Sequence, residues 1–190
     1  CSQRAEANRA VAEAVGRFGT LHGVFHLAGV LRDRTVVSRS AESSAAVLAS
    51  KLWGAVWLDE ATAELPLDCW VAFGSASAYV GVPGQVDYGY ANAALLAFGE
   101  TRAQAVEAGR RQGRTLVVSW PLWATGGMGV VEATVEVLRT HLGWEPLPSP
   151  VAFAAMESAL AAGRTAWAPV YGSPADIKQW ADRHWGTPHA

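Results

Sequence analysis

Apolar residues along the chain follow two patterns that alternate from one end to the other. Over residues 3–18 they recur every three or four positions, which predicts an amphipathic helix ending at Gly19. Residues 23–27 are instead a short continuous apolar run, typical of a buried strand. The same patterns predict further helices over 43–64, 88–108 and 150–162, and further strands over 69–73, 116–120 and 166–170.

This alternation predicts an α/β fold, because strands that are apolar throughout are typical of a parallel sheet with helices on both faces. Pro169 within the last run indicates an edge strand. A final short helix is expected to begin at Ser173 or Pro174. In such a sheet ligands lie at the carboxyl ends of the strands, which here are Ala28–Gly29, Gly74–Ser75 and Pro121 onward.

Composition narrows the function classes. The 190 residues suit one domain, and 15 basic against 17 acidic residues leave no basic excess for binding a nucleic acid. No apolar run reaches the ~18 residues of a membrane span. Two cysteines, Cys1 and Cys69, form no disulfide framework, which favours a reducing, cytoplasmic location, and no metal site is expected because His26 has no partner at ligand spacing.

Charged residues make up only 17% of the chain, and there are nine tryptophans. A typical soluble domain has about 25% charged residues. We therefore expect a partner to cover much of the surface, or the chain to be part of something longer. The absence of an initiator methionine also predicts a fragment.

Four polar residues near the strand ends have the chemistry of carbonyl reduction. Ser75 follows a strand, Tyr88 begins the next helix, Asn92 is one turn further on the same face, and Lys51 lies on the preceding helix. A serine can hold a carbonyl oxygen while a tyrosine protonates it, and a nearby ammonium would lower the tyrosine pKa from about 10. Each residue also has an ordinary interpretation: a turn cap, a packing residue or a solvated side chain.

Four segments resemble the ketoreductase domains of modular polyketide synthases, which belong to the short-chain dehydrogenase/reductase superfamily. They are His26–Asp33, Ala49–Gly54, Phe73–Ala93 and Ser119–Met128. In the wider superfamily a lysine stands four residues after the tyrosine, whereas here Asn92 does and the lysine is Lys51. That exchange is typical of polyketide and fatty-acid ketoreductases.

The resemblance implies a role for each candidate residue. Tyr88 would be the proton donor, Ser75 would orient the carbonyl, and Lys51 and Asn92 would complete a tetrad. Ala28 and Gly29 would line the ribose of NADPH, and Pro121 and Leu122 would meet its nicotinamide end. Residues 125–142 would form a mobile lid, with Gly126, Gly127 and Gly129 as its flexible part. Substrate contact and stereocontrol would fall to Leu31, Asp33, Val80, Pro83, Trp123 and Met128.

By the same resemblance, residues 1–172 are the carboxyl-terminal part of a catalytic subdomain, and 173–190 are a helix or linker. The fold expected is the second half of a doubly wound Rossmann-type sheet, since the amino-terminal cofactor-binding half has no counterpart in this sequence. The activity implied is NADPH-dependent reduction of a β-ketoacyl thioester, held by phosphopantetheine on an acyl carrier protein, to a D-β-hydroxyacyl thioester. Expected partners are that carrier protein, the other synthase domains and the missing half. Two alternatives stay open: a non-catalytic fragment, and a free-standing ketone reductase.

Overall fold

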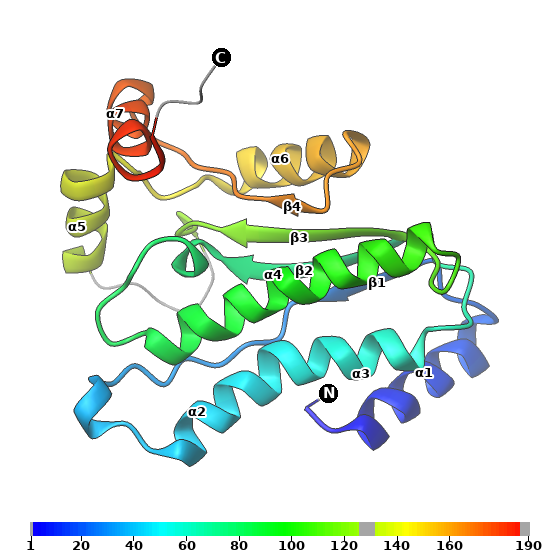
Figure 1. Ribbon diagram of the computed structural model, residues 1–190. Helices are drawn as coiled ribbons and strands as arrows, with labels where there is room; N and C mark the ends of the chain where they lie inside the picture. The colour runs from blue at the N-terminus through cyan, green and yellow to red at the C-terminus, as the bar shows by residue number, and fades with distance from the viewer. Residues whose placement is uncertain (1, 126–131, 187–190) are drawn as a thin grey trace.

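Four parallel strands form the central sheet of the protein, in the order β1-β2-β3-β4 (Figure 1). A computed structural model describes residues 2–125 and 132–186. The strands are β1 (Gly23–His26), β2 (Cys69–Ser75), β3 (Arg114–Trp120) and β4 (Ala166–Trp167). In the described part of the chain, β1 and β4 are the two edges, so the edge position predicted from Pro169 is confirmed.

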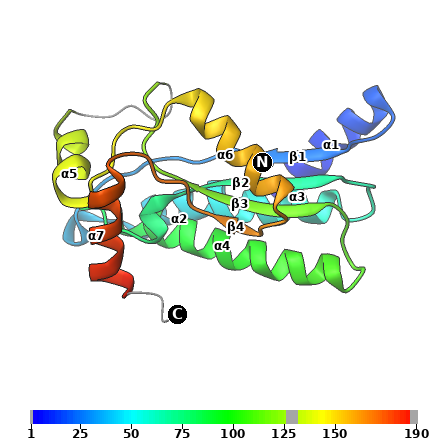
Figure 2. The same cartoon turned by 90° about the horizontal axis from the view of Figure 1, so that it is seen from above.

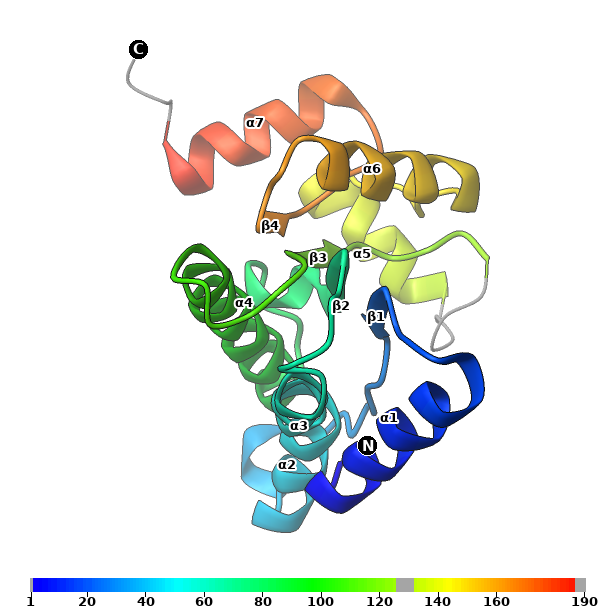
Figure 3. The same cartoon turned by 90° about the vertical axis from the view of Figure 1, so that its right-hand side faces the viewer.

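Helices cover the two faces of this sheet unequally (Figure 3). One face carries α1 (Arg4–Phe18), α3 (Gly54–Ala61) and α4 (Val86–Glu107), and the other carries α6 (Ser149–Ala161). The predicted α/β class with helices on both faces is therefore confirmed.

Alternate residues of each strand divide between two apolar cores. On the α1–α3–α4 side, Trp70 and Ala72 of β2 pack with Leu95 of α4. On the α6 side, Val71 of β2 packs with Ala152 of α6 and its neighbours. Burying one such aliphatic or aromatic side chain contributes about 1.5–3 kcal/mol, so packing on both faces stabilises the sheet.

Strand β1 is covered on one face only. Val24 and His26 are buried on the side of α1 and α3. Phe25 and, just beyond the strand, Leu27 are 50% and 56% exposed. In the described residues, only β2 pairs with β1. The sheet therefore presents an open, partly apolar margin at this strand.

Two carboxyl-terminal helices, α5 (Glu132–Leu142) and α7 (Pro174–Trp185), lie at the end of the sheet where the strands finish (Figure 1 and Figure 2). Trp144, just after α5, meets Trp180 of α7 edge to face at 5.6 Å. Leu138, Leu142 and Ile177 pack around this pair. Residues 173–186 are thus packed against the rest of the domain.

The predicted elements are present, but helix α5 lies where the sequence predicted only a lid segment, and two predicted elements differ in form. The helix expected over 43–64 is α2 (Ala41–Leu48) joined to α3 by one π turn, η2 (Ala49–Trp53). The last strand ends at Trp167 rather than at residue 170, because Pro169 has no N–H for the ladder. Two short 3₁₀ turns, η1 (Val36–Ser38) and η3 (Ala76–Ala78), complete the described structure. None of the described helices is long and apolar enough to cross a membrane.

Candidate active site

The carboxyl end of β2 and the first turn of α4 meet at the end of the sheet, as the sequence predicted. Ser75 is the last residue of β2, and its Oγ accepts a hydrogen bond from the Ser77 amide at 3.2 Å, which caps η3. The α4 backbone approaches η3 closely at Gly89, where a Cβ atom would lie 2.9 Å from the Ser77 carbonyl oxygen. A residue without a side chain therefore lets the helix bring Tyr88 beside Ser75.

Tyr88 is partly buried next to two of its predicted partners. Burial raises the pKa of the phenol, while hydrogen bonding with the side chains of Asn92 and Ser75 opposes that rise, and the negative charge of Asp33 adds to it. The net direction is upward, so the phenol stays protonated at neutral pH, as a proton donor must. Asn92 is fully buried, and its Nδ2 donates to the Tyr88 carbonyl at 2.8 Å.

Lys51 lies in the π turn η2 and is only 4% exposed. Its Nζ donates to the carbonyl oxygen of Phe73 at 2.8 Å, which ties η2 to the end of β2. A Cβ atom at Gly29 would lie 2.8 Å from the same Nζ, so the ammonium group also abuts the loop that follows β1. Burial lowers the pKa of Lys51 to about 8. Single π turns inside helices are frequent at functional sites.

The sequence predicts that the ammonium group of Lys51 lowers the pKa of the Tyr88 phenol. The net direction at Tyr88 is upward because burial is the largest cause, and the Nζ of Lys51 donates to the Phe73 carbonyl. The effect of Lys51 on this pKa stays a prediction. The solvated position considered for Lys51 is wrong, because the side chain is buried.

His26 is a core histidine, as the sequence indicated, and it also holds η2 in place. Its Nε2 lies 2.8 Å from the backbone carbonyl oxygen of Lys51. Because a carbonyl only accepts, this nitrogen carries the proton and donates. Burial lowers the pKa of His26 to about 4; the hydrogen bond to Lys51 opposes this shift, and the charge of Lys51 adds to it.

The buried His26 should make the protein sensitive to acid. Its pKa is lowered on folding, so below about pH 6.5 the unfolded state takes up a proton that the folded state does not. The free energy of unfolding should therefore fall by about 2 kcal/mol between about pH 7 and about pH 5. Urea unfolding at the two pH values measures this difference. His26→Gln, which keeps an N–H donor, should remove most of it, whereas His22→Gln, at an exposed histidine, should leave it in place. An equal loss in all three proteins would contradict the assignment.

The loop after β1 places Asp33 near the tyrosine. Asp33 Oδ2 accepts a hydrogen bond from Gln85 Nε2 at 2.8 Å, and its charge contributes to the raised pKa of Tyr88. Pro83 and Gly84 form the centre of a tight turn ahead of α4, in which Gly84 has a φ of 82° and the Gln85 amide donates to Val82. This is the type II turn that a Pro-Gly pair favours. Of the predicted stereocontrol residues, Asp33 and Pro83 thus lie around one turn.

Two other predicted residues, Val80 and Trp123, pack in apolar clusters. Val80 packs with the apolar cluster around Trp144 and Trp180. Trp123 packs edge to face against Trp120 at 5.0 Å and against Phe153 at 5.8 Å, within the core on the α6 side. None of these contacts brings Val80 or Trp123 to the Tyr88 phenol.

The remaining candidates lie beside the strand ends. Pro121 is buried directly after β3, and the carbonyl of Leu122 accepts from the Leu147 amide at 2.7 Å. Ala28 is exposed and Leu31 is half-buried in the loop after β1. The expected Met128 contact and the lid glycines Gly126, Gly127 and Gly129 fall outside the described residues. Among the described residues, no three His, Cys, Asp or Glu side chains gather to hold a metal ion.

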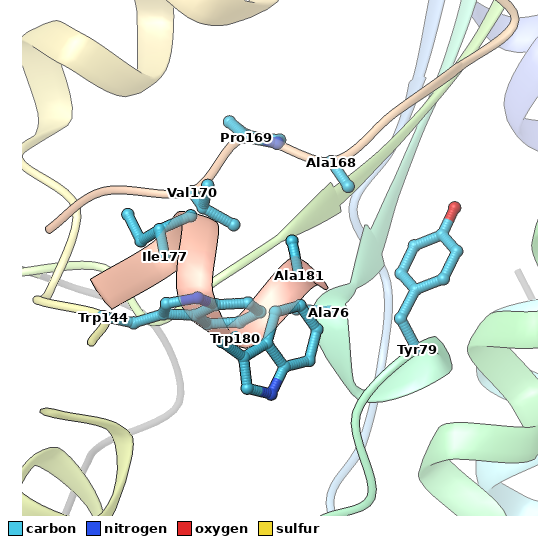
Figure 4. A pocket seen from close by; sticks show the side chains of 9 residues that line it. All are labelled: Ala76, Tyr79, Trp144, Ala168, Pro169, Val170, Ile177, Trp180 and Ala181. Carbon is cyan, nitrogen blue, oxygen red and sulfur yellow. The ribbon is translucent and has the colours of Figure 1, made fainter. Parts of the chain in front are cut away.

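An apolar cavity of about 130 Å³ lies between η3, α7 and the chain after β4 (Figure 4). Ala76, Tyr79 and Trp180 line it together with Pro169 and Val170. None of the tetrad residues Lys51, Ser75, Tyr88 and Asn92 contributes to its wall. We therefore do not assign the chemistry to this cavity.

Sequence reasoning did not single out three residues that adjoin the site: Arg39, Gln85 and Asp87. Asp87 is buried and forms an ion pair with Arg39. The only signal was a charged residue next to Tyr88 in an otherwise uncharged segment, and a buried charge requires a partner. Nothing in the linear sequence identified that partner as Arg39.

Comparison with known proteins agrees with this geometry. The KR domain family matches residues 1–125. The polyketide synthase ThaG of Burkholderia thailandensis is 42% identical over 160 residues, which is 84% of this chain and 3% of that protein. PksL of Bacillus subtilis, also a polyketide synthase, is 41% identical over 66% of this chain and again 3% of its own length.

Solved structures show the same relationship. A ketoreductase domain from the bacillaene assembly line superposes with a TM-score of 0.90 at 30% identity, over 94% of this chain and 43% of its own. A short-chain dehydrogenase from Burkholderia cenocepacia, solved with NADP, has a TM-score of 0.76 at 19% identity over 90% of this chain and 73% of its own, which supports the fold alone.

The chain thus belongs to the KR domain family, the ketoreductase domains of polyketide synthases within the short-chain dehydrogenase/reductase superfamily. The family resemblance seen in the sequence is confirmed. The chain spans only about 3% of the length of these two curated relatives.

Proposed function

We propose that this chain carries the catalytic tetrad of an NADPH-dependent β-ketoacyl reductase that acts during polyketide biosynthesis. The substrate would be a β-ketoacyl thioester on the phosphopantetheine arm of an acyl carrier protein. The observation that carries the proposal is the convergence of Tyr88, Ser75, Asn92 and the buried Lys51 at the carboxyl ends of β1 and β2. The family membership of the chain supports the same activity.

Each of these residues has a separate role in carbonyl reduction. A bound nicotinamide cofactor would supply the hydride to the carbonyl carbon. The Ser75 hydroxyl donates a hydrogen bond to the carbonyl oxygen, and Tyr88 transfers its phenolic proton to that oxygen as negative charge develops there. The raised pKa of Tyr88 keeps this proton available at neutral pH. The product is a β-hydroxyacyl thioester, and the phenolate is then reprotonated from solvent.

The residues present fit the nicotinamide and ribose end of such a cofactor. Asn92 Oδ1 is buried and has no hydrogen-bond partner among the described residues, so a polar acceptor is free at the site. The ammonium group of Lys51 abuts Gly29 in the loop that follows β1, next to Ala28, where the ribose would lie. Pro121 and Leu122, after β3, would meet the nicotinamide ring. The other half of the cofactor would be held by a segment that pairs with β1.

We further propose that residues 1–172 are the catalytic subdomain and that the other synthase domains are its neighbours. A chain that is non-catalytic by itself is the second candidate. The half-exposed Phe25 on the open face of β1 favours it, because a reductase needs a completed sheet to hold its cofactor. We call residues 1–190 joined by a segment that completes the sheet beyond β1 the assembled reductase.

A binding and turnover experiment separates these candidates. The completing segment is taken from the part of the bacillaene-assembly-line ketoreductase that this chain does not cover. Quenching of tryptophan fluorescence by NADPH is expected for the assembled reductase and should be weak for the chain alone. Oxidation of NADPH should follow when a carrier-bound β-ketoacyl thioester is added. Binding without turnover would refute the proposed activity, and faster turnover of free small ketones would favour a free-standing ketone reductase.

The alcohol formed should have the D configuration. In ketoreductases of this kind an Asp in the loop after the strand marks that outcome, and Asp33 stands two residues after Leu31. Val80 occupies the position where the opposite class carries a tryptophan. Asp33 accepts a hydrogen bond from Gln85, in the turn that leads into α4 and Tyr88, which supports a place for this loop beside the reacting carbonyl. Chiral chromatography of the product tests this, and a dominant L-alcohol would contradict it.

A further inference from the structure

The loop after β1 is attached to the turn that precedes α4 by two hydrogen bonds. Gln85 Nε2 donates to Asp33 Oδ2 at 2.8 Å. The amide of Arg34 donates to the carbonyl oxygen of Gly84 at 3.0 Å. These two segments are distant in the sequence, and together they carry Asp33 and lead into Tyr88.

The side chain of Arg39 strengthens this attachment by contacting both segments. Its Nη2 donates to the carbonyl oxygens of Arg34 and Gly84, both at 2.6 Å. Its Nη1 forms an ion pair with Asp87 Oδ2. A single guanidinium group therefore contacts the loop, the turn and the first turn of α4 together. We call this set of contacts the Arg39 clamp.

Asp87 connects the clamp to the tyrosine. Its second oxygen, Oδ1, accepts a hydrogen bond from the backbone amide of Tyr88 at 2.8 Å. One carboxylate thus binds Arg39 through one oxygen and the backbone of Tyr88 through the other. A shift of Arg39 would be transmitted to Tyr88 through a single side chain.

The ion pair is buried, since the side chains of Arg39 and Asp87 are 9% and 6% exposed. A buried ion pair is often no more stabilising than apolar residues of the same volume, because both charges lose their hydration. The contribution of this ion pair is to hold the loop, the turn and α4 in one orientation. The planar guanidinium presents several donors in a fixed arrangement, which a lysine cannot reproduce.

We propose that Arg39 is a positioning residue that holds the Asp33 loop against the first turn of α4 and so sets where Asp33 stands relative to Tyr88. The consequence for the reaction rests on the proposed function. The clamp fixes which face of the ketone is presented to the hydride, so losing the clamp lowers the stereochemical purity of the alcohol. In the described part of the chain, the side-chain hydrogen bonds and ion pair of Arg39 are made to Arg34, Gly84 and Asp87, none of which belongs to the tetrad.

The first test needs no activity. Hydrogen exchange, followed by NMR on the assembled reductase, reports the amides of Arg34 and Tyr88. In Arg39→Met both should exchange about tenfold faster or more, because the local opening that exposes them becomes easier. Arg39→Lys should have a smaller effect, since it keeps the positive charge but loses the planar set of guanidinium donors. Arg34→Ala is the matched control: it removes an exposed arginine of the same loop and leaves its backbone contacts, so exchange should not change.

Arg39→Met leaves Asp87 buried without its partner and can prevent folding. The double variant Arg39→Met, Asp87→Asn removes both charges and keeps an oxygen that accepts from the Tyr88 amide. It should fold, and its Arg34 amide should still exchange faster. Unchanged exchange at Arg34 in the double variant would overturn the proposal.

The second test measures the product. Loss of the clamp should lower the ratio of D to L alcohol by about tenfold, the scale set by one hydrogen bond to a charged group. A purely structural role would lower the amount of active protein and leave this ratio unchanged. Faster exchange with an unchanged ratio would overturn the stereochemical part of the proposal. If the parent protein reduces no thioester, the proposed function fails, and hydrogen exchange alone decides the positioning role.

Discussion

Replacing Tyr88 with phenylalanine should lower the turnover of the assembled reductase by about a hundred- to ten-thousandfold, the range that general acid catalysis contributes. Only one hydroxyl is lost, and the aromatic ring that packs at the start of α4 remains. The thermal midpoint and the binding of NADPH should therefore change little. Steady-state rates with a carrier-bound β-ketoacyl thioester provide the measurement.

The matched control is Tyr90→Phe, on the same helix. Tyr90 is exposed, so losing its hydroxyl should leave the rate unchanged. A Tyr88→Phe enzyme that keeps more than about a tenth of the parent rate would show that another group supplies the proton. Equal losses in the two variants would point to an effect on α4 rather than to chemistry.

The open margin at β1 should make the chain by itself prone to aggregation or to melting at low temperature. Phe25 and Leu27 are about half exposed, and in the described part of the chain β1 has a neighbour on one side only. An exposed apolar edge without lysine, proline or a bulge is a site for pairing with another chain. Covering these side chains should add about 3 kcal/mol and raise the thermal midpoint by roughly ten degrees.

Co-expression with the completing segment tests this expectation. The two polypeptides should co-purify, and the complex should melt higher than the chain alone. Phe25→Lys should make the isolated chain more soluble and weaken the association, because a charge on the margin opposes pairing. Val37→Lys, a change at an exposed position away from the sheet, should do neither. A soluble monomer with a cooperative melt above about 60 °C would show that the margin needs no partner.

The local pattern of apolar residues was enough to predict the fold class and most of the elements. Strand β2 and helix α4 follow directly from a continuous apolar run and a helical repeat, because both patterns depend only on neighbouring residues. The placement of Ser75 and Tyr88 at one end of the sheet also followed, since parallel strands finish at the same edge. The family resemblance then assigned roles to these residues.

Tertiary structure alone decided how the site is held together. The π turn that buries Lys51 is stabilised by a hydrogen bond from His26 of strand β1, and the periodicity of residues 43–64 does not predict this turn. The ion pair of Arg39 with Asp87 likewise joins two segments that meet only after β1 and α4 have packed. Periodicity reports which face of an element is buried. Which charged groups then lie within hydrogen-bonding distance depends on how separate elements pack, and no local pattern records that.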